Sequence, residues 1–174
     1  MTRTTTALLL CSAIFISVFE RARAQSPAST PKPAANLAQL MRGTLYPESN
    51  VVFAAQDTNP SDIQHAKDPS MSTDLLTSQY GKWDAVENSA LAIAEVSDLL
   101  MAPGRKCANG VDVPVGNPDW AKFVQELRDA GTAAYAAAQT KNQDKMTDVA
   151  GTMTEACKHC HDKYREKRFA QRCK

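Results

Sequence analysis

The chain has 174 residues, of which 43% are hydrophobic, and its formal net charge is +1. This length and hydrophobic content suffice for one domain with a buried core. The first 24 residues hold three arginines and one glutamate, so the remainder carries a formal charge of −1. Such a balance provides no overall basic field for binding nucleic acid or an anionic membrane.

The N-terminus has the pattern of a cleaved secretory signal peptide, which we assign to residues 1–24. Arg3 supplies the positive charge, residues 6–19 form an apolar run, and Ala22-Arg23-Ala24 offers a cleavage site. The apolar run is short for a membrane span, although a retained N-terminal anchor stays open as an alternative. Leu10 stands before Cys11 where a lipoprotein signal needs a small residue. Residues 25–33, rich in Ser and Pro, are expected to form a flexible leader.

Beyond the leader, the domain of residues 34–174 reads as helix, with no alternating strand pattern. The expected helices begin near Ala34, near Tyr80, at Asn117-Pro118 and near Asn142, and the last one is expected to end near Gln171. Pro47 should kink or restart the first helix. A polar connection with two prolines, residues 57–72, separates it from the second helix. These features predict an all-α fold, an antiparallel up-down-up-down four-helix bundle.

The helical stripes predict which residues form the core. In the second helix the stripe is Val86, Ala90, Ile93, Ser97 and Leu100. In the third it is Trp120, Val124, Leu127, Gly131, Ala134 and Ala138, where the side chains change from bulky to small.

A C-x-x-C-H motif lies near the end of the chain, at Cys157-Lys158-His159-Cys160-His161. This spacing is the attachment signature of a c-type haem, in which two thiols form thioethers and the following histidine ligates iron. On a helix, Cys157, Cys160 and His161 share one face. His159 is poorly aimed for the axial position. The motif therefore predicts one covalent haem on the last helix.

Two alternative chemistries for the motif remain open. A thioredoxin-like C-x-x-C would need a βαβ context, which the sequence does not offer. A zinc site would need Cys157, Cys160 and His161 together with a remote cysteine, whereas structural zinc usually has paired ligand spacings.

A C-terminal C-x-x-C-H in a four-helix chain resembles the class II cytochromes c, namely cytochrome c′ and its low-spin soluble relatives. Residues 41–53, 83–90, 99–105 and 157–164 are similar to segments of that family. The resemblance implies that Cys157 and Cys160 hold the haem and that His161 is the proximal ligand. Arg165, four residues later, matches the basic position beside that histidine. Leu37 stands where cytochromes c′ often have an arginine.

The sixth iron position decides the function. In an antiparallel bundle, Met41 lies roughly 10 Å from the start of the first helix and His161 roughly 15 Å from the expected end of the last. Met41 can therefore face the haem as distal ligand, and the alternative is that it only packs in the core. Arg42 and Arg105 are candidate partners for the haem propionates, or else solvated arginines. Trp120 and Tyr164 are expected to wall the haem.

These features predict an exported monohaem c-type cytochrome, soluble in the periplasm, that carries electrons through His/Met-ligated iron to an unidentified redox partner. It would be no enzyme, and would keep no stable membrane insertion after signal cleavage. The rival is a five-coordinate protein that binds NO or CO. A homodimer is common in the resembled family, but no exposed apolar stripe demands one here.

Cys107 and Cys173 are the two cysteines that remain outside the motif in the domain. The bundle topology places both at the same end, and an oxidising compartment favours a disulfide between them. We expect their Cα atoms to lie within about 7 Å.

Overall fold

The computed structural model describes residues 32–165 and residue 173. The chain divides into two units, Met1–Thr30 and Pro31–Lys174, and the described residues all belong to the second. The predicted signal peptide and all of the predicted leader except residues 32 and 33 lie outside the described residues.

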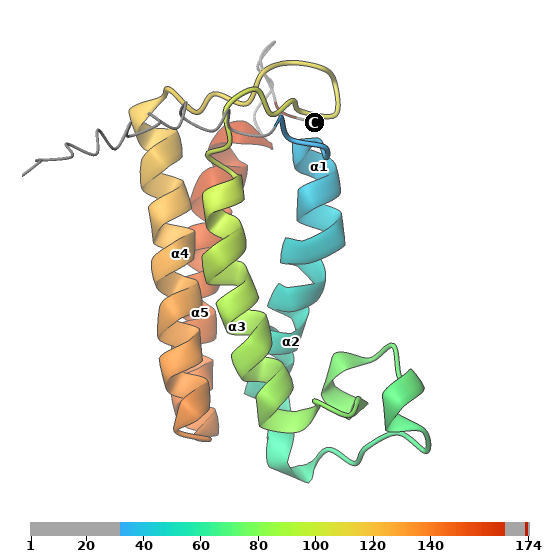
Figure 1. Ribbon diagram of the computed structural model, residues 1–174. Coiled ribbons are helices and arrows are strands. Elements are labelled where there is room, and N and C mark those ends of the chain that lie inside the picture. The colour runs from blue at the N-terminus through green and yellow to red at the C-terminus, as the bar shows by residue number, and fades with distance from the viewer. Residues whose placement is uncertain (1–31, 166–172, 174) are drawn as a thin grey trace, which may run out of the picture. The chain divides into compact units, whose positions relative to one another are not determined.

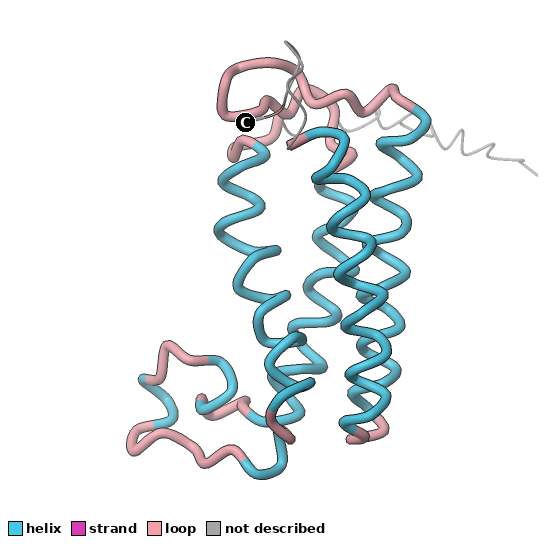
Figure 2. The backbone as a smooth tube through the Cα atoms, turned by 180° about the vertical axis from the view of Figure 1, so that it is seen from behind, coloured by secondary structure: helices cyan, strands magenta, loops and turns pink. Residues whose placement is uncertain are grey.

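The described part of the chain is helical and has no β-strand, as the sequence predicts (Figure 1). Its helices lie side by side: α3 packs against both α2 and α4, and α5 packs against both α2 and α4 (Figures 1 and 2). None of the described helices is long and apolar enough to cross a membrane. The elements in chain order are α1 (Leu37–Leu40), a π-helical turn (Met41–Leu45), α2 (Tyr46–Asp57), α3 (Lys82–Leu99), α4 (Pro118–Gln139) and α5 (Gln143–Tyr164).

Local signals explain where the helices begin. Asn36 accepts a hydrogen bond from the backbone of Gln39, and the Gln39 side chain accepts one from the Asn36 N–H. This capping box starts α1 at Leu37, so the predicted start near Ala34 is three residues early. Pro118 occupies the first position of α4, where its missing N–H costs nothing, and Asn142 caps α5.

Pro47 interrupts the first helix, but the interruption has a different form from the predicted kink. The turn before it, Met41–Leu45, is π-helical, and the Tyr46 N–H donates to the carbonyl of Met41 five residues earlier. Pro47 has no N–H to give to Gly43, so a widened turn at this point replaces a regular α-helical one. The helix therefore continues without a break, and α2 begins at Tyr46, directly after the π-helical turn.

The predicted core stripes are buried. Every residue of the two stripes expected on α3 and α4 is buried. At Gly131 a Cβ would lie 2.8 Å from the backbone nitrogen of Ala94, so this glycine allows α3 and α4 to approach closely. The small end of the α4 stripe is therefore used for contact between helices.

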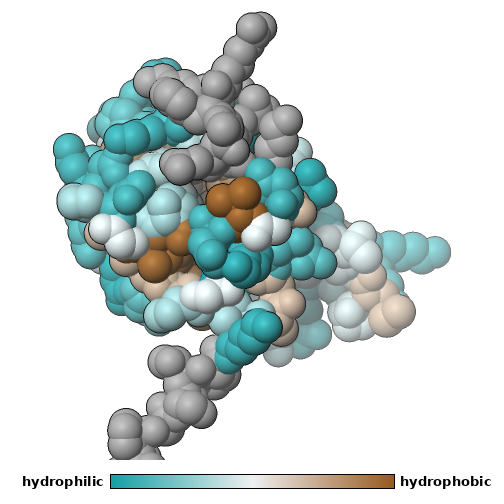
Figure 3. All heavy atoms as spheres, turned by 90° about the horizontal axis from the view of Figure 1, so that it is seen from above, coloured by the Kyte–Doolittle hydropathy of each residue, from teal (hydrophilic) through white to brown (hydrophobic). Residues whose placement is uncertain are grey.

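Three contacts join the α3–α4 connection to other parts of one end of the bundle, the end that faces the viewer in Figure 3. The Leu37 N–H donates to the Lys106 carbonyl (2.8 Å), and the Arg105 guanidinium donates to the Ala35 carbonyl (2.6 Å). Cys107 and Cys173 lie together as a disulfide-like pair, with the two Cα atoms 5.0 Å apart, inside the predicted limit.

The predicted end of the last helix is wrong. We expected it near Gln171, but α5 ends at Tyr164. The Cys173 N–H donates to the Tyr164 carbonyl (3.3 Å), so Cys173 lies beside the end of α5. A helix running to Gln171 would carry the chain roughly 10 Å past Tyr164, and Cys173 would then miss Cys107.

Candidate cofactor site

A cavity of about 420 Å³ lies between α5, α4 and the helix formed by α1, the π-helical turn and α2. This volume is in the range of small-molecule and cofactor sites. The lining is mainly apolar, and it comprises Leu37, Ala38, Met41, Arg42, Leu45, Tyr46, Ser49, Ile93, Leu100, Trp120, Phe123, Val124, Leu127, Met153, Ala156, Cys157, Cys160, His161, Tyr164, Arg165 and Cys173.

The two motif cysteines lie on the α5 wall of this cavity. Both are half-buried, and they are not bonded to each other. Burial raises the pKa of the Cys157 thiol, and burial together with Cys157 raises the pKa of Cys160 to about 12. A thioredoxin-like pair works through a thiol of lowered pKa. These thiols show the opposite shift, which speaks against a thioredoxin-like role for the motif.

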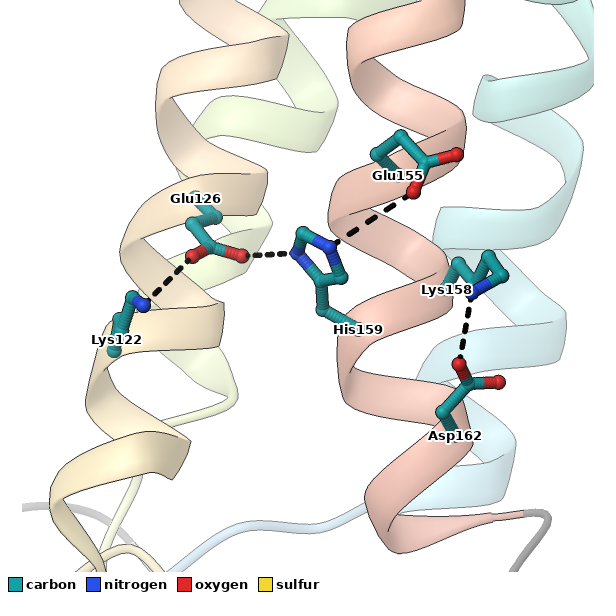
Figure 4. Close-up of polar contacts among 6 residues, drawn as sticks. All are labelled: Lys122, Glu126, Glu155, Lys158, His159 and Asp162. Atoms are coloured by element: carbon teal, nitrogen blue, oxygen red, sulfur yellow. Dashed lines mark hydrogen bonds and ion pairs between the residues drawn. The ribbon is translucent and has the colours of Figure 1, made fainter.

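The two histidines of the motif have different surroundings. His161 lines the cavity. His159 points from α5 toward α4, and its Nδ1 lies 2.9 Å from a carboxylate oxygen of Glu126 (Figure 4). His159 is not among the lining residues, in agreement with the expectation that it is poorly aimed for the axial position.

Met41 lies on the wall supplied by the first helix. It is the first residue of the π-helical turn, it is half-buried, and it lines the same cavity as His161. Met41 comes four residues after the start of α1, and His161 three residues before the end of α5, or about 6 Å and 5 Å along the two axes. Counted from these two helix ends, the two residues stand at similar distances, although the end predicted for the last helix is wrong.

Aromatic side chains from α4 and α5 form a third part of the lining. Trp120 is buried, its Nε1 donates to the Leu100 carbonyl (3.2 Å), and its ring meets that of Tyr164 edge-on at 4.9 Å. Both were expected to wall the site. Phe123 also lines it, although this residue was not among those predicted. Its position three residues after Trp120 was the available signal, since residues at that spacing share a helix face.

The three candidate arginines are placed differently. Arg42 and Arg165 are exposed and line the cavity. Arg105 is buried and is not part of the lining. Its guanidinium donates to the carbonyls of Leu99 (3.0 Å) and Ala35 (2.6 Å), and burial lowers its pKa. Arg105 thus connects the end of α3 to the residues before α1.

The described residues also bear on the zinc alternative. Within residues 32–165 and residue 173, no three His, Cys, Asp or Glu side chains come together in a way that could hold a metal ion. The described part of the chain therefore offers no ready set of zinc ligands.

Comparison with known proteins finds a match to the segment that carries the α4 and α5 part of this site. Residues 116–165 match the family model of cytochrome c′, and they contain all of α4 and α5 together with the C-x-x-C-H motif. The chain is class II cytochrome c-like over this segment. The predicted resemblance is confirmed there. No curated protein and no solved structure matches the chain.

The match to cytochrome c′ implies a haem cofactor, and the residues present fit that cofactor. Two half-buried thiols and an imidazole stand on one helix and border an apolar cavity, and a methionine borders it from another helix. The thiols suit covalent attachment, the imidazole and thioether suit iron, and the apolar walls suit a porphyrin.

Proposed function

We propose that the protein is an exported monohaem c-type cytochrome that carries electrons between redox partners and has no substrate of its own. One observation carries this proposal. Cys157, Cys160 and His161 on α5 border the same cavity as Met41 on the first helix. When bound, haem supplies the reversible one-electron change of its iron.

Each of these residues has a separate part in the proposal. Cys157 and Cys160 hold the cofactor through thioethers, His161 is the proximal ligand and Met41 the distal one. A thioether ligand favours ferrous iron and raises the reduction potential, which suits electron transfer. The apolar side chains around them keep water from the site.

The up-down-up-down order of the helices belongs to this proposal, and contacts at one end of the bundle support it. The last residue of α5, Tyr164, bonds to Asp119 in the first turn of α4. The first residue of α1, Leu37, bonds to Lys106 in the α3–α4 connection. Both contacts are expected when neighbouring helices alternate in direction.

The proposed location is the periplasm, and its support comes from the sequence. Residues 1–24 have the pattern of a secretory signal peptide. A disulfide between Cys107 and Cys173 would also suit an oxidising compartment. The redox partner is a second, unidentified periplasmic protein. The proposed protein binds no nucleic acid and has no stable membrane insertion after signal cleavage.

A five-coordinate protein that binds NO or CO is the second candidate. The observation that favours it is the composition of the wall around Met41, where Leu37, Ala38 and Leu45 are apolar. If Met41 stands aside from the iron, these three neighbours offer no ligand in its place, and the sixth position is open to a gas.

Spectra of the purified protein, produced with the machinery for c-type haem maturation, test the proposal. We expect haem colour and a mass increment of one haem that survive denaturation, and a low-spin ferrous spectrum that changes slowly under carbon monoxide. Replacing Cys157 or Cys160 by Ser should leave a single thioether. Rapid carbon monoxide binding by a high-spin ferrous form would support the gas-binding candidate, and a colourless protein would contradict both.

A further inference from the structure

The last turn of α5 is held by a single carboxylate of α4. The Tyr164 hydroxyl donates to Oδ1 of Asp119 (2.7 Å), and the Lys163 ammonium pairs with Oδ2 of the same side chain. Asp119 lies in the first turn of α4 and its side chain is 27% exposed. One residue thus contacts two consecutive residues of the neighbouring helix.

These two contacts act on the turn that carries His161. Lys163 and Tyr164 follow His161 by two and three residues, and the Arg165 N–H donates to the His161 carbonyl (2.9 Å) to complete the turn. The ring of Tyr164 also meets Trp120 at 4.9 Å and Phe123 at 6.3 Å between ring centres. The position of Tyr164 is therefore fixed from α4 by a hydrogen bond and two ring contacts.

Among the polar contacts to the last turn of α5, those of Asp119 are expected to be the strongest, for two reasons. Hydrogen bonds to an ionised carboxylate are stronger than neutral ones. Asp119 stands at a helix N-terminus and Lys163 at a helix C-terminus, so both helix dipoles favour their charges. Asn117 could have capped α4, but it makes no side-chain cap, and its amide instead lies 3.4 Å from the Tyr164 hydroxyl.

A second, weaker contact is made by a residue of the motif that precedes His161. Glu126, seven residues after Asp119 on α4, accepts from or pairs with His159, which is about half exposed at 47% (Figure 4). Asp119, Phe123 and Glu126 follow the i, i+4, i+7 spacing of one helix face. This face of α4 therefore contacts α5 both before and after His161.

We propose that Asp119 is a positioning residue for the proximal histidine. Through Tyr164 and Lys163 it holds the last turn of α5, so that the His161 imidazole keeps a fixed direction toward the cavity. Helix ends open most readily, and without this support the turn that bears the iron ligand would open more often. The inference rests on the proposed function, because it takes His161 as the iron ligand.

The test compares Asp119→Asn, Tyr164→Phe and the double variant in the holoprotein. Asp129→Asn is the matched control, since it is the same substitution on α4 at a residue whose hydrogen bond, from Gln125 (2.8 Å), stays within that helix. Tyr164→Phe removes the hydrogen bonds of this hydroxyl with Asp119 and Asn117 without changing charge. Two measurements are made, namely the electron paramagnetic resonance spectrum of the ferric iron and hydrogen exchange of the backbone amides of residues 161–165.

We expect Asp119→Asn and Tyr164→Phe to shift the ferric g-values, which report the direction of the axial ligands. Exchange of the last-turn amides should accelerate about tenfold or more, the factor that corresponds to losing a charge-assisted hydrogen bond. The double variant should change less than the sum of the two single variants, because both remove the same hydrogen bond. Asp129→Asn should match the wild type.

Folded, coloured variants with wild-type g-values and wild-type exchange would overturn the proposal. If Asp119→Asn fails to fold, the conservative Tyr164→Phe still decides it. A colourless wild-type protein would instead overturn the proposed function. Amide exchange remains measurable without haem, so the two failures are distinguishable.

Discussion

At the scale of single residues, Met41 decides between the two candidate functions. The chain has two other methionines in its bundle core, Met146 and Met153, and both are fully buried. Met41 is half-buried and borders the cavity opposite the motif helix. This placement is expected of a residue that faces a cofactor, although a side chain packed beside the core would also be half-buried.

We therefore expect Met41→Ala to open the sixth iron position. The ferrous spectrum should move toward high spin, carbon monoxide should bind rapidly, and the reduction potential should fall because the thioether that favoured ferrous iron is gone. Absorption spectra and redox titration measure these changes. Met146→Ala is the matched control: it should lose roughly 2–5 kcal/mol of stability and keep the wild-type spectrum. Equal carbon monoxide binding by wild type and Met41→Ala would exclude ligation.

At the scale of the elements, two helical glycines should respond to alanine in opposite directions. Gly43 lies in the π-helical turn, and a Cβ there would meet nothing within 4 Å. Gly131 lies in α4, where a Cβ would stand 2.8 Å from the Ala94 nitrogen and 3.0 Å from the Ala90 carbonyl oxygen. The first position has space, whereas the second is filled by the backbone of α3.

Gly43→Ala should therefore raise the free energy of unfolding by roughly 0.5–1 kcal/mol, because alanine loses less backbone entropy on folding. Gly131→Ala should lower it by roughly 1–3 kcal/mol, the cost of overpacking a close helix contact. Denaturant titrations of the two variants measure both changes, and each variant serves as the control for the other. A loss of stability in Gly43→Ala would show that the π-helical turn itself requires glycine.

The elements also show how far the sequence predicts this structure. Periodic stripes and starting signals such as Asn117-Pro118 predicted the core faces of α3 and α4 and the start of α4. The π-helical turn was not foreseen, because the sequence shows only that Pro47 lacks a donor and not how the chain compensates. The end of α5 was misplaced because the basic residues after Tyr164 suit a helix terminus at several positions.

In the candidate site, too, some residues were predictable from the sequence and others were not. The motif residues Cys157, Cys160 and His161 were predictable because the C-x-x-C-H spacing is the attachment signature of a c-type haem. Met41 was predictable from its height in the bundle. The position of Arg105 outside the cavity lining was not predictable, because it depends on how the α3–α4 connection folds against the residues before α1. The contact of Asp119 with Tyr164 was not predictable either, because it depends on which helix lies beside α4.

At the scale of the whole molecule, the pair Cys107–Cys173 connects the α3–α4 connection to the C-terminal end of the chain. Cys107 is fully buried, and Cys173 both is buried and lines the cavity. The same connection is bonded to the start of the first helix through Leu37 and Lys106. The pair therefore closes the end of the bundle at which both candidate iron ligands lie.

We expect this pair to form a disulfide in the mature protein and to stabilise it globally. Its two cysteines are 66 residues apart in the sequence. For a closed loop of this length the chain-entropy model gives a stabilisation of roughly 4 kcal/mol, which strain would reduce. The double variant Cys107→Ser/Cys173→Ser should therefore unfold at lower denaturant concentration than the wild type.

Treating the wild type with reductant should reproduce that loss, because thioethers to haem are not reduced with the disulfide. The double variant itself should not respond to reductant. Identical unfolding of the wild type with and without reductant would show that the two cysteines are unbonded neighbours, and that the other contacts at this end of the bundle hold it without a disulfide.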